Sequence, residues 1–346
     1  MAVDPSRPFN LPELPPADAL RQIVNGYFMY RAVYAVAKLG IADLLVDGPK
    51  SSQELAALTE SHPGVLYRVL RLVASGGVLA EDDARRFSLT PLGEGLRSDV
   101  PGSRRGHIIL MGEPMFWNSW GKLVEGVQTG DSPFSHAFDD EFFAYMRKHP
   151  DAASIYNDAM GDSARTRAAG VVAAYDFAGV GTVVDVAGGN GTLIATILAA
   201  HPEMRGILFD QPAVVAESGP VLDAAGVADR CRVVSGSFFE SVPEGGDAYT
   251  LSQIIHDWPD EQASEILKSC QRAMAPGARL LIIDQVIPPG NGPHQSKYGD
   301  VLMFVVHGAQ ERTAAVFEVL LDDAGFSFQR VIPTTTQFSV VEAVRR

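Results

Sequence analysis

The stretch VVDVAGGNG, residues 183–191, runs from a β-branched segment into a glycine-rich turn, which is followed by the helix-forming residues 192–200. Glycines in such a turn let the backbone approach a bulky ligand at the carboxyl edge of a strand. The next β-branched run, RGILFD, ends in Asp210, 25 residues after Asp185. A carboxylate in that place can accept both hydroxyls of a ribose. The two segments together predict a site for a nucleoside-bearing cofactor.

The spacing of the glycines argues against a dinucleotide as the cofactor. A dinucleotide fingerprint needs a third glycine three residues after Gly191, and Ile194 stands there. Asp185, two residues before the turn, suits a ligand with a cationic amino-acid end, because a carboxylate can bind an ammonium group directly or through water. An ordinary Asn-Gly turn between a strand and a helix remains the alternative when this motif is taken alone.

The C-terminal half alternates short β-branched runs with helical stretches. This alternation is typical of a parallel sheet with crossover helices. The last two runs, FSFQRVIP and FSVVEAVR, are separated by a threonine-rich turn and predict an antiparallel closing hairpin. The preceding runs are TVVDVA, RGILFD, CRVVSG, DAYTLSQII and ARLLIIDQV.

The N-terminal half is dominated by helical patterns. Apolar residues recur at helical spacing from Asp18 to about Leu45, and Ser51 with Glu54 forms a capping box before an apolar run. Short strand-like pieces flank the polar turn EDDARR, and Thr90 with Pro91 predicts the start of another helix. This order is that of a winged helix. We therefore expect a mainly α-helical domain over residues 1–168 and an α/β domain over residues 169–346.

The composition limits the partners and the compartment. A length of 346 residues favours two domains, and a formal net charge of −14 would repel the phosphates of nucleic acids and anionic lipids. The two cysteines, Cys231 and Cys270, are too few for a disulfide framework. The N-terminus lacks the pattern of a secretory signal, and no apolar run is long enough to span a membrane. We expect a cytoplasmic protein that binds neither nucleic acid nor membrane.

Several motifs in a fixed order resemble the class I small-molecule O-methyltransferases. This family includes plant caffeate and isoflavone enzymes, hydroxyindole enzymes and bacterial antibiotic-tailoring enzymes of secondary metabolism. The resemblance covers nearly the whole chain. It implies a Rossmann-like methyltransferase domain, S-adenosylmethionine as the cofactor, and a homodimer in which the partner's N-terminal helix completes the substrate site. The motifs are DVAGGNG (185–191), Asp210-Gln211-Pro212, LSQIIHDW (251–258), Asp260-Glu261 and GAQERT (308–313).

The resemblance implies that His256 is the base that removes the proton of an acceptor hydroxyl. A neutral imidazole near pH 7 suits this task. Two acidic residues flank the histidine in the family and correspond to Asp284 and Glu311, which we expect to orient the imidazole and to stabilise its protonated form. A surface histidine ahead of a helix cap is the alternative from the local sequence alone. We expect no metal, because the base is a side chain and no cluster of His, Asp and Glu has ligand spacing.

The resemblance also implies contacts to the cofactor and the acceptor. Phe238 is expected to pack on the adenine, while Ser237 stands where an aspartate often binds the adenine amine, and Ala187 replaces a common loop glycine. The expected cofactor-binding residues are Asp185, Gly188, Gly189, Asp210, Gln211, Gly236, Ser237, Phe238 and Ser252. The expected substrate-binding residues are Trp117, Tyr156, Met160 and Asp257, with core packing as an equal alternative for the first three.

These residues together predict an enzyme that methylates a hydroxyl of a small phenolic or polycyclic natural product. An amine acceptor is less expected, because amines need a base less. A ligand-sensing regulator is one rival, but residues 51–99 hold five arginines against seven acids, a net charge of −2, where a DNA-binding module should be positive. A relative that binds the cofactor and performs other chemistry is the second rival. Such relatives tend to lose the histidine that is retained here as His256.

Overall fold

The computed structural model describes residues 14–100 and 102–346. Within them the chain forms two compact units. Of the described residues, the N-terminal unit contains 14–118 and 146–162, and the C-terminal unit contains 119–145 and 163–346. We expected one domain boundary, after residue 168. The units instead change after residues 118, 145 and 162, because the helices between residues 119 and 145 belong to the C-terminal unit.

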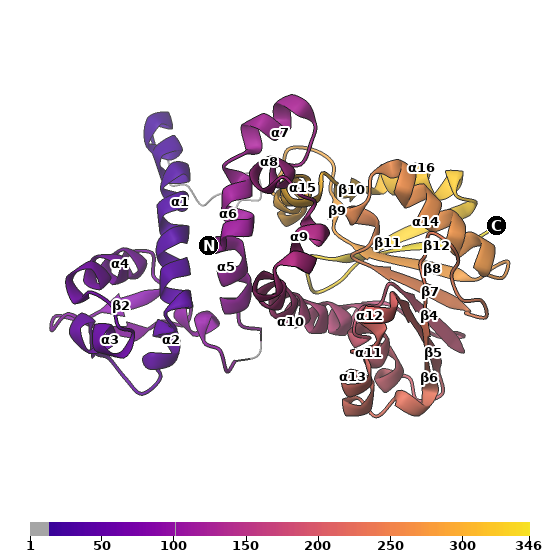
Figure 1. Ribbon diagram of the computed structural model, residues 1–346, viewed down its shortest axis with the longest axis horizontal. Coiled ribbons are helices and arrows are strands. Elements are labelled where there is room, and N and C mark those ends of the chain that lie inside the picture. The colour runs from indigo at the N-terminus through magenta and orange to yellow at the C-terminus, as the bar shows by residue number, and fades with distance from the viewer. Residues whose placement is uncertain (1–13, 101) are drawn as a thin grey trace. The chain divides into compact units, whose positions relative to one another are not determined.

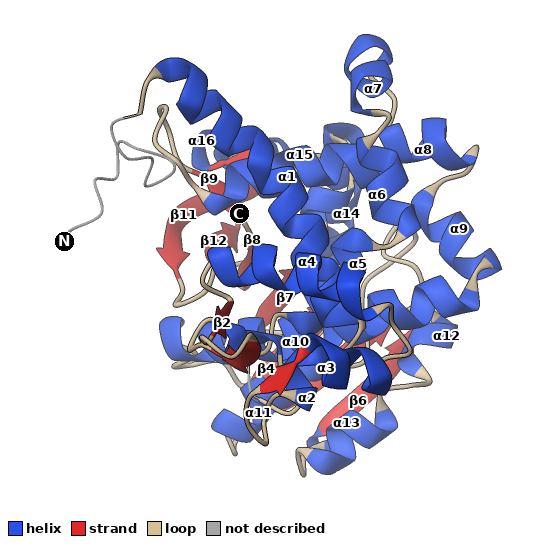
Figure 2. Cartoon of the chain, turned by 90° about the vertical axis from the view of Figure 1, so that its left-hand side faces the viewer, coloured by secondary structure: helices blue, strands red, loops and turns tan. Residues whose placement is uncertain are grey.

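The N-terminal unit is mainly helical and contains short strands (Figure 1, Figure 2). The strands pair antiparallel in the order β1-β3-β2, which gives the expected winged helix. Apolar side chains of α1, α3 and α4, such as Val36, Leu55 and Leu70, form its core. From the N-terminus the elements are α1 (Pro16–Lys38), α2 (Ile41–Leu44), β1 (Lys50–Ser51), α3 (Ser52–Leu58), α4 (Pro63–Ser75), β2 (Leu79–Glu81), β3 (Arg86–Leu89), the 3₁₀ helix η1 (Gly93–Leu96), α5 (Arg105–Gly112) and α6 (Pro114–Trp120).

Local side-chain bonds explain two of these boundaries. The capping box at α3 is confirmed, since the Ser51 hydroxyl accepts from the Glu54 N–H at 3.2 Å and the Glu54 carboxylate accepts from the Ser51 N–H at 2.7 Å. The α-helix expected from Thr90 is wrong. The Thr90 hydroxyl instead donates to the Gly77 carbonyl at 2.7 Å and accepts from the Gly93 N–H at 3.1 Å, which closes a tight turn followed only by η1.

A series of helices leads from the first unit into the second. The longest, α10, begins in the N-terminal unit and ends in the C-terminal unit, with the change between residues 162 and 163. These helices are α7 (Leu123–Thr129), α8 (Pro133–Phe138), α9 (Phe142–Lys148) and α10 (Pro150–Ala174).

The C-terminal unit is built on a mostly parallel sheet with the strand order β11-β12-β8-β7-β4-β5-β6. The strands from β8 to β6 pair in parallel, whereas β11 and β12 form an antiparallel hairpin at one edge, as expected. A short parallel pair, β9 with β10, lies apart from it. The elements are β4 (Thr182–Val186), α11 (Thr192–Ala200), β5 (Arg205–Asp210), α12 (Pro212–Val215), α13 (Gly219–Ala224), η2 (Ala228–Arg230), β6 (Cys231–Ser235), β7 (Ala248–Ser252), η3 (Ile255–Asp257), α14 (Asp260–Ala273), β8 (Arg279–Asp284), β9 (Val286–Ile287), α15 (Gln295–His307), β10 (Arg312–Thr313), α16 (Ala314–Asp323), β11 (Phe326–Pro333) and β12 (Ser339–Arg345).

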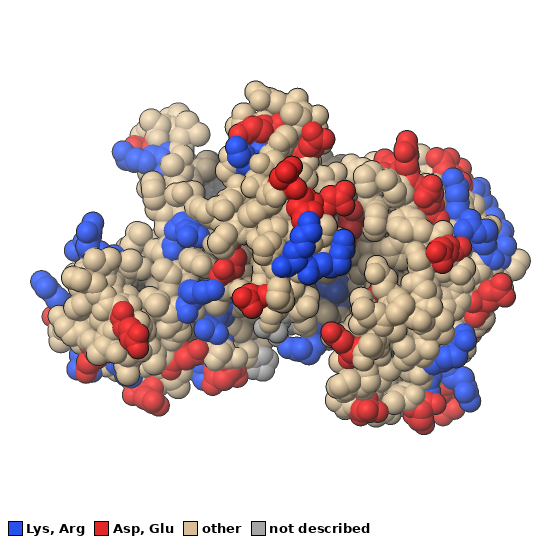
Figure 3. All heavy atoms as spheres, viewed as in Figure 1, with Lys and Arg blue, Asp and Glu red and all other residues tan. Residues whose placement is uncertain are grey.

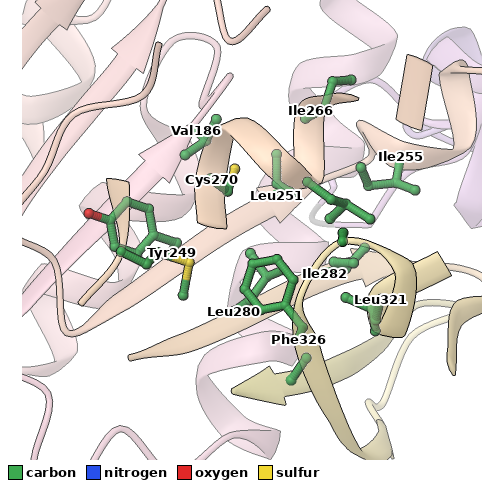
Figure 4. Close-up of a cluster of buried hydrophobic side chains, with 14 of the residues drawn as sticks. Val186, Tyr249, Leu251, Ile255, Ile266, Cys270, Leu280, Ile282, Leu321 and Phe326 are labelled. Atoms are coloured by element: carbon green, nitrogen blue, oxygen red, sulfur yellow. The ribbon is translucent and has the colours of Figure 1, made fainter. Parts of the chain in front are cut away.

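Helices cover both faces of this sheet, as a parallel sheet requires. On one face, Ile266 of α14 and Leu321 of α16 pack against Leu251 and Ile282 of the strands (Figure 4). On the other face, α10, α11 and α13 contribute side chains that include Leu198. The two clusters that cover the sheet are therefore apolar.

Charged side chains of both signs are interspersed over the face drawn in Figure 3. A continuous basic stripe, which phosphate binding would use, is not visible on that face. Over the residues that the structure describes, no helix combines the length and apolar character needed to cross a membrane.

Candidate functional site

The glycine-rich turn lies at the carboxyl end of β4 and takes left-handed backbone angles. The φ angles are 54° at Ala187, 62° at Gly189 and 84° at Gly191. Ala187 adopts this region at a cost of about 1 kcal/mol, because its Cβ crowds the following carbonyl. A Cβ added to Gly188 would lie 2.5 Å from both Asp185 Oδ2 and Leu208 Cδ1. The turn thus combines tight packing beneath it with two adjacent residues, Gly188 and Gly189, that carry no side chain.

Asp185 lies directly below this turn and is fully buried. Its Oδ1 accepts from the Thr250 hydroxyl at 2.6 Å, but its Oδ2 has no hydrogen-bond partner among the described residues. Burial raises the pKa of Asp185 to about 6, against the opposing effect of the Thr250 bond. A buried acceptor without a donor fits a site that receives a cationic or hydrogen-bond-donating group.

Asp210 ends β5 beside the turn, as expected from the sequence. Its Oδ2 accepts from the Gly189 N–H at 2.8 Å and its Oδ1 from the Gln211 N–H at 2.6 Å. Each carboxylate oxygen can accept more than one bond, so acceptor capacity remains for a ribose. Burial raises the pKa of Asp210. Gln211 is the N-terminal cap of α12 but makes no side-chain capping bond.

The turn after β6 supplies an aromatic surface next to this edge. A Cβ on Gly236 would lie 2.7 Å from the Phe209 ring, so the backbone there packs directly on an aromatic side chain. Phe238 contacts Phe239 edge-on, with ring centroids 4.8 Å apart. Ser237 accepts from the Phe239 N–H at 3.3 Å. The geometry fits a nucleoside with a cationic amino-acid end, and S-adenosylmethionine has both parts.

His256 does not lie on the strand itself. The sequence DAYTLSQII was expected to continue as one strand, but β7 stops at Ser252 because Gln253 has a φ of 56°. The chain then forms η3, which carries His256 with only 4% of its surface exposed. The surface-histidine alternative is therefore wrong.

Three carboxylates surround this imidazole. Nδ1 of His256 lies 3.0 Å from Glu311 Oε1, and Nε2 lies 3.5 Å from Asp257 Oδ1. Desolvation by burial would lower the pKa of His256, but Asp284, Asp257 and Glu311 together outweigh it and raise the pKa to about 10. These charges favour the imidazolium over the neutral imidazole that the sequence led us to expect near pH 7.

Asp284 and Glu311 lie near His256, as the sequence led us to expect. Asp284 is fully buried at the end of β8, and neither of its carboxylate oxygens has a hydrogen-bond partner among the described residues. Burial, followed by the charges of Glu311 and Asp257, raises its pKa to about 7, although His256 opposes the shift. Glu311 Oε1 also accepts from Gln285 Nε2 at 3.0 Å, which fixes this oxygen toward the imidazole.

Two further residues near His256 were not singled out from the sequence. The guanidinium of Arg312 donates to the carbonyls of Ile255 and Trp258 at 2.6 and 2.7 Å, which bracket η3. His307 ends α15, and its Nε2 lies 3.8 Å from the same Asp257 oxygen that faces His256. Arg312 lies within the motif at residues 308–313 and could have been noticed there, whereas nothing local marks His307.

The expected substrate-binding residues fall in different units. Asp257 lies beside the base in the C-terminal unit, but Trp117, Tyr156 and Met160 belong to the N-terminal unit. Trp117 stacks on Tyr30, and the Arg31 guanidinium lies 4.2 Å from the Trp117 ring centroid. Acceptor contacts of these residues therefore stay predictions. Over the described residues, no group of three or more His, Cys, Asp or Glu side chains is arranged to hold a metal.

Known proteins resemble the chain in both units. An O-methyltransferase domain matches residues 120–327, and an O-methyltransferase dimerisation domain matches residues 21–99. A phenazine O-methyltransferase of Lysobacter antibioticus is 44% identical over 95% of this chain and 96% of its own. The 8-amino-8-demethylriboflavin N,N-dimethyltransferase of Streptomyces davaonensis is 35% identical over 97% of each chain.

A solved structure extends the similarity to the cofactor. The calicheamicin-biosynthesis methyltransferase CalO1, in its SAH-bound form, superposes with a TM-score of 0.86 at 38% identity, covering 97% of this chain and 100% of its own. The matches span both units, and the glycine turn, Asp185 and Asp210 fit the same cofactor. The chain therefore belongs to the S-adenosylmethionine-dependent O-methyltransferase family.

Proposed function

We propose that this enzyme transfers a methyl group to a hydroxyl of a polycyclic aromatic acceptor and that His256 removes the hydroxyl proton. The observation that carries the proposal is the buried imidazole, held by Glu311 at one ring nitrogen and faced by Asp257 at the other. A carboxylate behind an imidazole fixes its tautomer and supports its protonated form, as in other histidine bases.

The cofactor site is proposed to hold its ligand by complementary charge and shape. When bound, S-adenosylmethionine supplies a methyl group that its sulfonium has already activated. The protein's part is then to bind, align and remove a proton. Asp185 would receive the ammonium group and Asp210 the ribose hydroxyls, while Gly188 leaves the turn open and Phe238 packs on the adenine. Gly189, Gln211, Gly236, Ser237 and Ser252 complete the proposed set.

The proton has a defined place on His256. Because Nδ1–H donates to Glu311, Nε2 is the atom that would take the acceptor's proton. A phenolic hydroxyl ionises near pH 10, and the pKa of His256 is raised to about 10. Nε2 can take this proton only where the imidazole is neutral, so turnover of hydroxyl acceptors should rise with pH toward the raised pKa of His256. Asp284 and Glu311 then stabilise the imidazolium beside the phenolate.

The relatives support an aromatic acceptor, on which either an oxygen or a nitrogen atom could receive the methyl group. One relative is named for a phenazine and methylates oxygen, and the other is named for a flavin amine and methylates nitrogen. Methylation of an aromatic amine is thus the second candidate. The two differ in their need for a base, because a neutral amine already carries the lone pair that attacks.

We also propose a homodimer formed through the N-terminal unit. Helix α1 exposes a row of large apolar side chains, and a contiguous exposed apolar patch typically marks an interface. The match to a dimerisation domain supports this assignment and gives the winged helix a role that does not involve DNA. The row consists of Leu20, Ile23, Val24, Tyr27 and Phe28.

A paired binding and turnover experiment tests the function. His256→Gln should bind SAH as tightly as the wild type in calorimetry, yet lose about 10²–10⁴-fold in kcat/KM on hydroxylated phenazines and naphthols. Full activity of His256→Gln on hydroxyl acceptors would exclude the base. Activity only on aromatic amines would favour the second candidate. Cofactor binding without turnover on any acceptor would indicate a relative with other chemistry.

A further inference from the structure

Arg167 of α10 binds two neighbouring side chains, those of Ser252 and Gln253. Arg167 belongs to none of the sequence motifs and has no part in the proposed proton transfer. Its Nε donates to the Ser252 hydroxyl oxygen at 2.9 Å, and a second guanidinium nitrogen donates to the side-chain oxygen of Gln253. The guanidinium carbon lies 5.2 Å from the Phe338 ring centroid. The side chain is thereby held at the end of β7, 85 residues away in sequence.

The bond from Arg167 to Ser252 leaves the Ser252 hydroxyl available as a hydrogen-bond donor. Ser252 ends β7, whose Leu251 pairs with Val186 next to the glycine turn. Because Ser252 Oγ accepts from a guanidinium, its own proton remains available for donation to another group. The amino-acid end of S-adenosylmethionine carries a carboxylate as well as an ammonium group. A serine fixed as a donor suits the carboxylate, while buried Asp185 on the neighbouring strand suits the ammonium.

The second bond holds a strained turn. Gln253 has a φ of 56°, which costs a non-glycine residue roughly 1 kcal/mol. Strain of this kind persists where surrounding contacts impose it and is frequent at functional sites. The backbone N–H of Gln253 donates to the Ile283 carbonyl at 3.0 Å, and its side chain accepts from Arg167. Three residues later the chain places His256 on η3.

We propose that Arg167 is a positioning residue that orients the Ser252 hydroxyl toward the cofactor and fixes the Gln253 turn ahead of His256. The Arg167 guanidinium therefore fixes the orientation of the Ser252 hydroxyl at the cofactor site. It also fixes the backbone turn at Gln253, which leads to His256. The proposal rests on the proposed function for the part that concerns His256, whereas the part that concerns Ser252 depends only on cofactor binding.

Calorimetry with SAH tests the Ser252 part without turnover. Arg167→Met keeps the apolar stem near Phe338 and removes the donors, and it should weaken SAH binding about tenfold. Ser252→Ala should weaken binding similarly. The double variant should bind no more weakly than Ser252→Ala alone, because Arg167 acts through that hydroxyl. Additive losses, or Arg167→Met binding within twofold of the wild type, would overturn the proposal.

Turnover at saturating cofactor tests the Gln253 part. Arg167→Met should lower kcat at least tenfold, and Gln253→Leu, which removes only the second acceptor, should lower kcat while SAH affinity stays within twofold. Arg167→Lys retains one donor and should recover part of the SAH affinity, which also separates loss of contact from loss of fold. An unchanged kcat in both Arg167→Met and Gln253→Leu would refute this part. Failure of the proposed function would instead appear as full activity of His256→Gln with these SAH effects intact.

Discussion

Replacing Arg312 by Met should loosen the turn that carries the base and should destabilise the C-terminal unit. The Arg312 side chain is 1% exposed, and its guanidinium donates to the carbonyls of Ile255 and Trp258 and to Asp260 Oδ1. Met fills much of the volume of the arginine stem but donates no hydrogen bond. The substitution therefore removes the bonds across η3 while keeping most of the packing.

The size of the effect follows from which partners are buried. Hydrogen bonds from a charged donor contribute about 1.5–3 kcal/mol each, and the two carbonyls lose one each, so the loss is about 3–6 kcal/mol. Asp260 is 58% exposed, so the ion pair adds only about 0–1 kcal/mol. For a unit of this size the melting temperature should fall by roughly 6–24 °C.

Differential scanning calorimetry measures this loss, with Asp260→Asn as the matched control. The control removes the exposed charge and leaves the carbonyl bonds, so its melting temperature should change by at most about 3 °C. If Arg312→Met and Asp260→Asn melt at the same temperature, the carbonyl bonds contribute nothing and the reasoning is wrong. Where Arg312→Met stays folded, its kcat should still fall, because His256 sits between the two carbonyls that have lost their donor.

Three further perturbations test other parts of the chain. Gly188→Ala should reduce SAH affinity at least tenfold, because its Cβ would lie 2.5 Å from Asp185 Oδ2, whereas Gly219→Ala, with nothing within 4 Å, should leave it unchanged in calorimetry. Asp284→Asn should move the rising limb of kcat/KM to lower pH, since Asp284 is the strongest of the carboxylates that raise the pKa of His256 to about 10; an unmoved limb in the pH profile would contradict this. Ser51→Ala should cost about 1 kcal/mol of unfolding free energy in urea, through loss of the α3 cap.

The pKa of His256 also affects stability, with a definite sign. Its value in the folded protein, about 10, lies above the unfolded value of about 6.5. The folded state therefore binds the proton more tightly, and this contribution is complete below about pH 6.5. It disappears as the pH rises from there to about 10. Urea unfolding across this range should show the loss in the wild type and a smaller loss in His256→Gln.

The sheet could be predicted from the sequence because its signals are local. Each buried strand is a β-branched run, and the closing pair FSFQRVIP and FSVVEAVR reads as a hairpin without reference to the rest of the chain. The predictions that were wrong depended on a single residue's backbone angle or a close approach. Periodicity cannot show that Gln253 turns left-handed and ends β7, or that Gly93 packs on the Val78 carbonyl and replaces a helix by η1.

The site was predictable only as far as its motifs reach. Asp210 and Glu311 belong to recognisable segments, and the structure places them beside the glycine turn and beside His256. The raised pKa of His256 was not predictable, because it depends on three carboxylates that converge on one buried ring. Arg167 was missed for a similar reason, since its partners lie 85 and 86 residues away and no local pattern links them.

In the proposed mechanism, the carboxylates around His256 would make the protonated ring part of the acceptor's binding site. An ionised acceptor beside Asp257, Asp284 and Glu311 would be repelled if the imidazole were neutral, because like charges in a buried site interact strongly. With the proton on Nε2, the same carboxylates would stabilise the cation that this mechanism places opposite the acceptor oxygen. Methylation removes the negative charge of that oxygen, so the product loses its attraction to the imidazolium. The arrangement that favours binding of the oxyanion therefore also favours release of the methylated product. It slows the loss of the proton from Nε2, which must leave before His256 can accept a proton from the next acceptor.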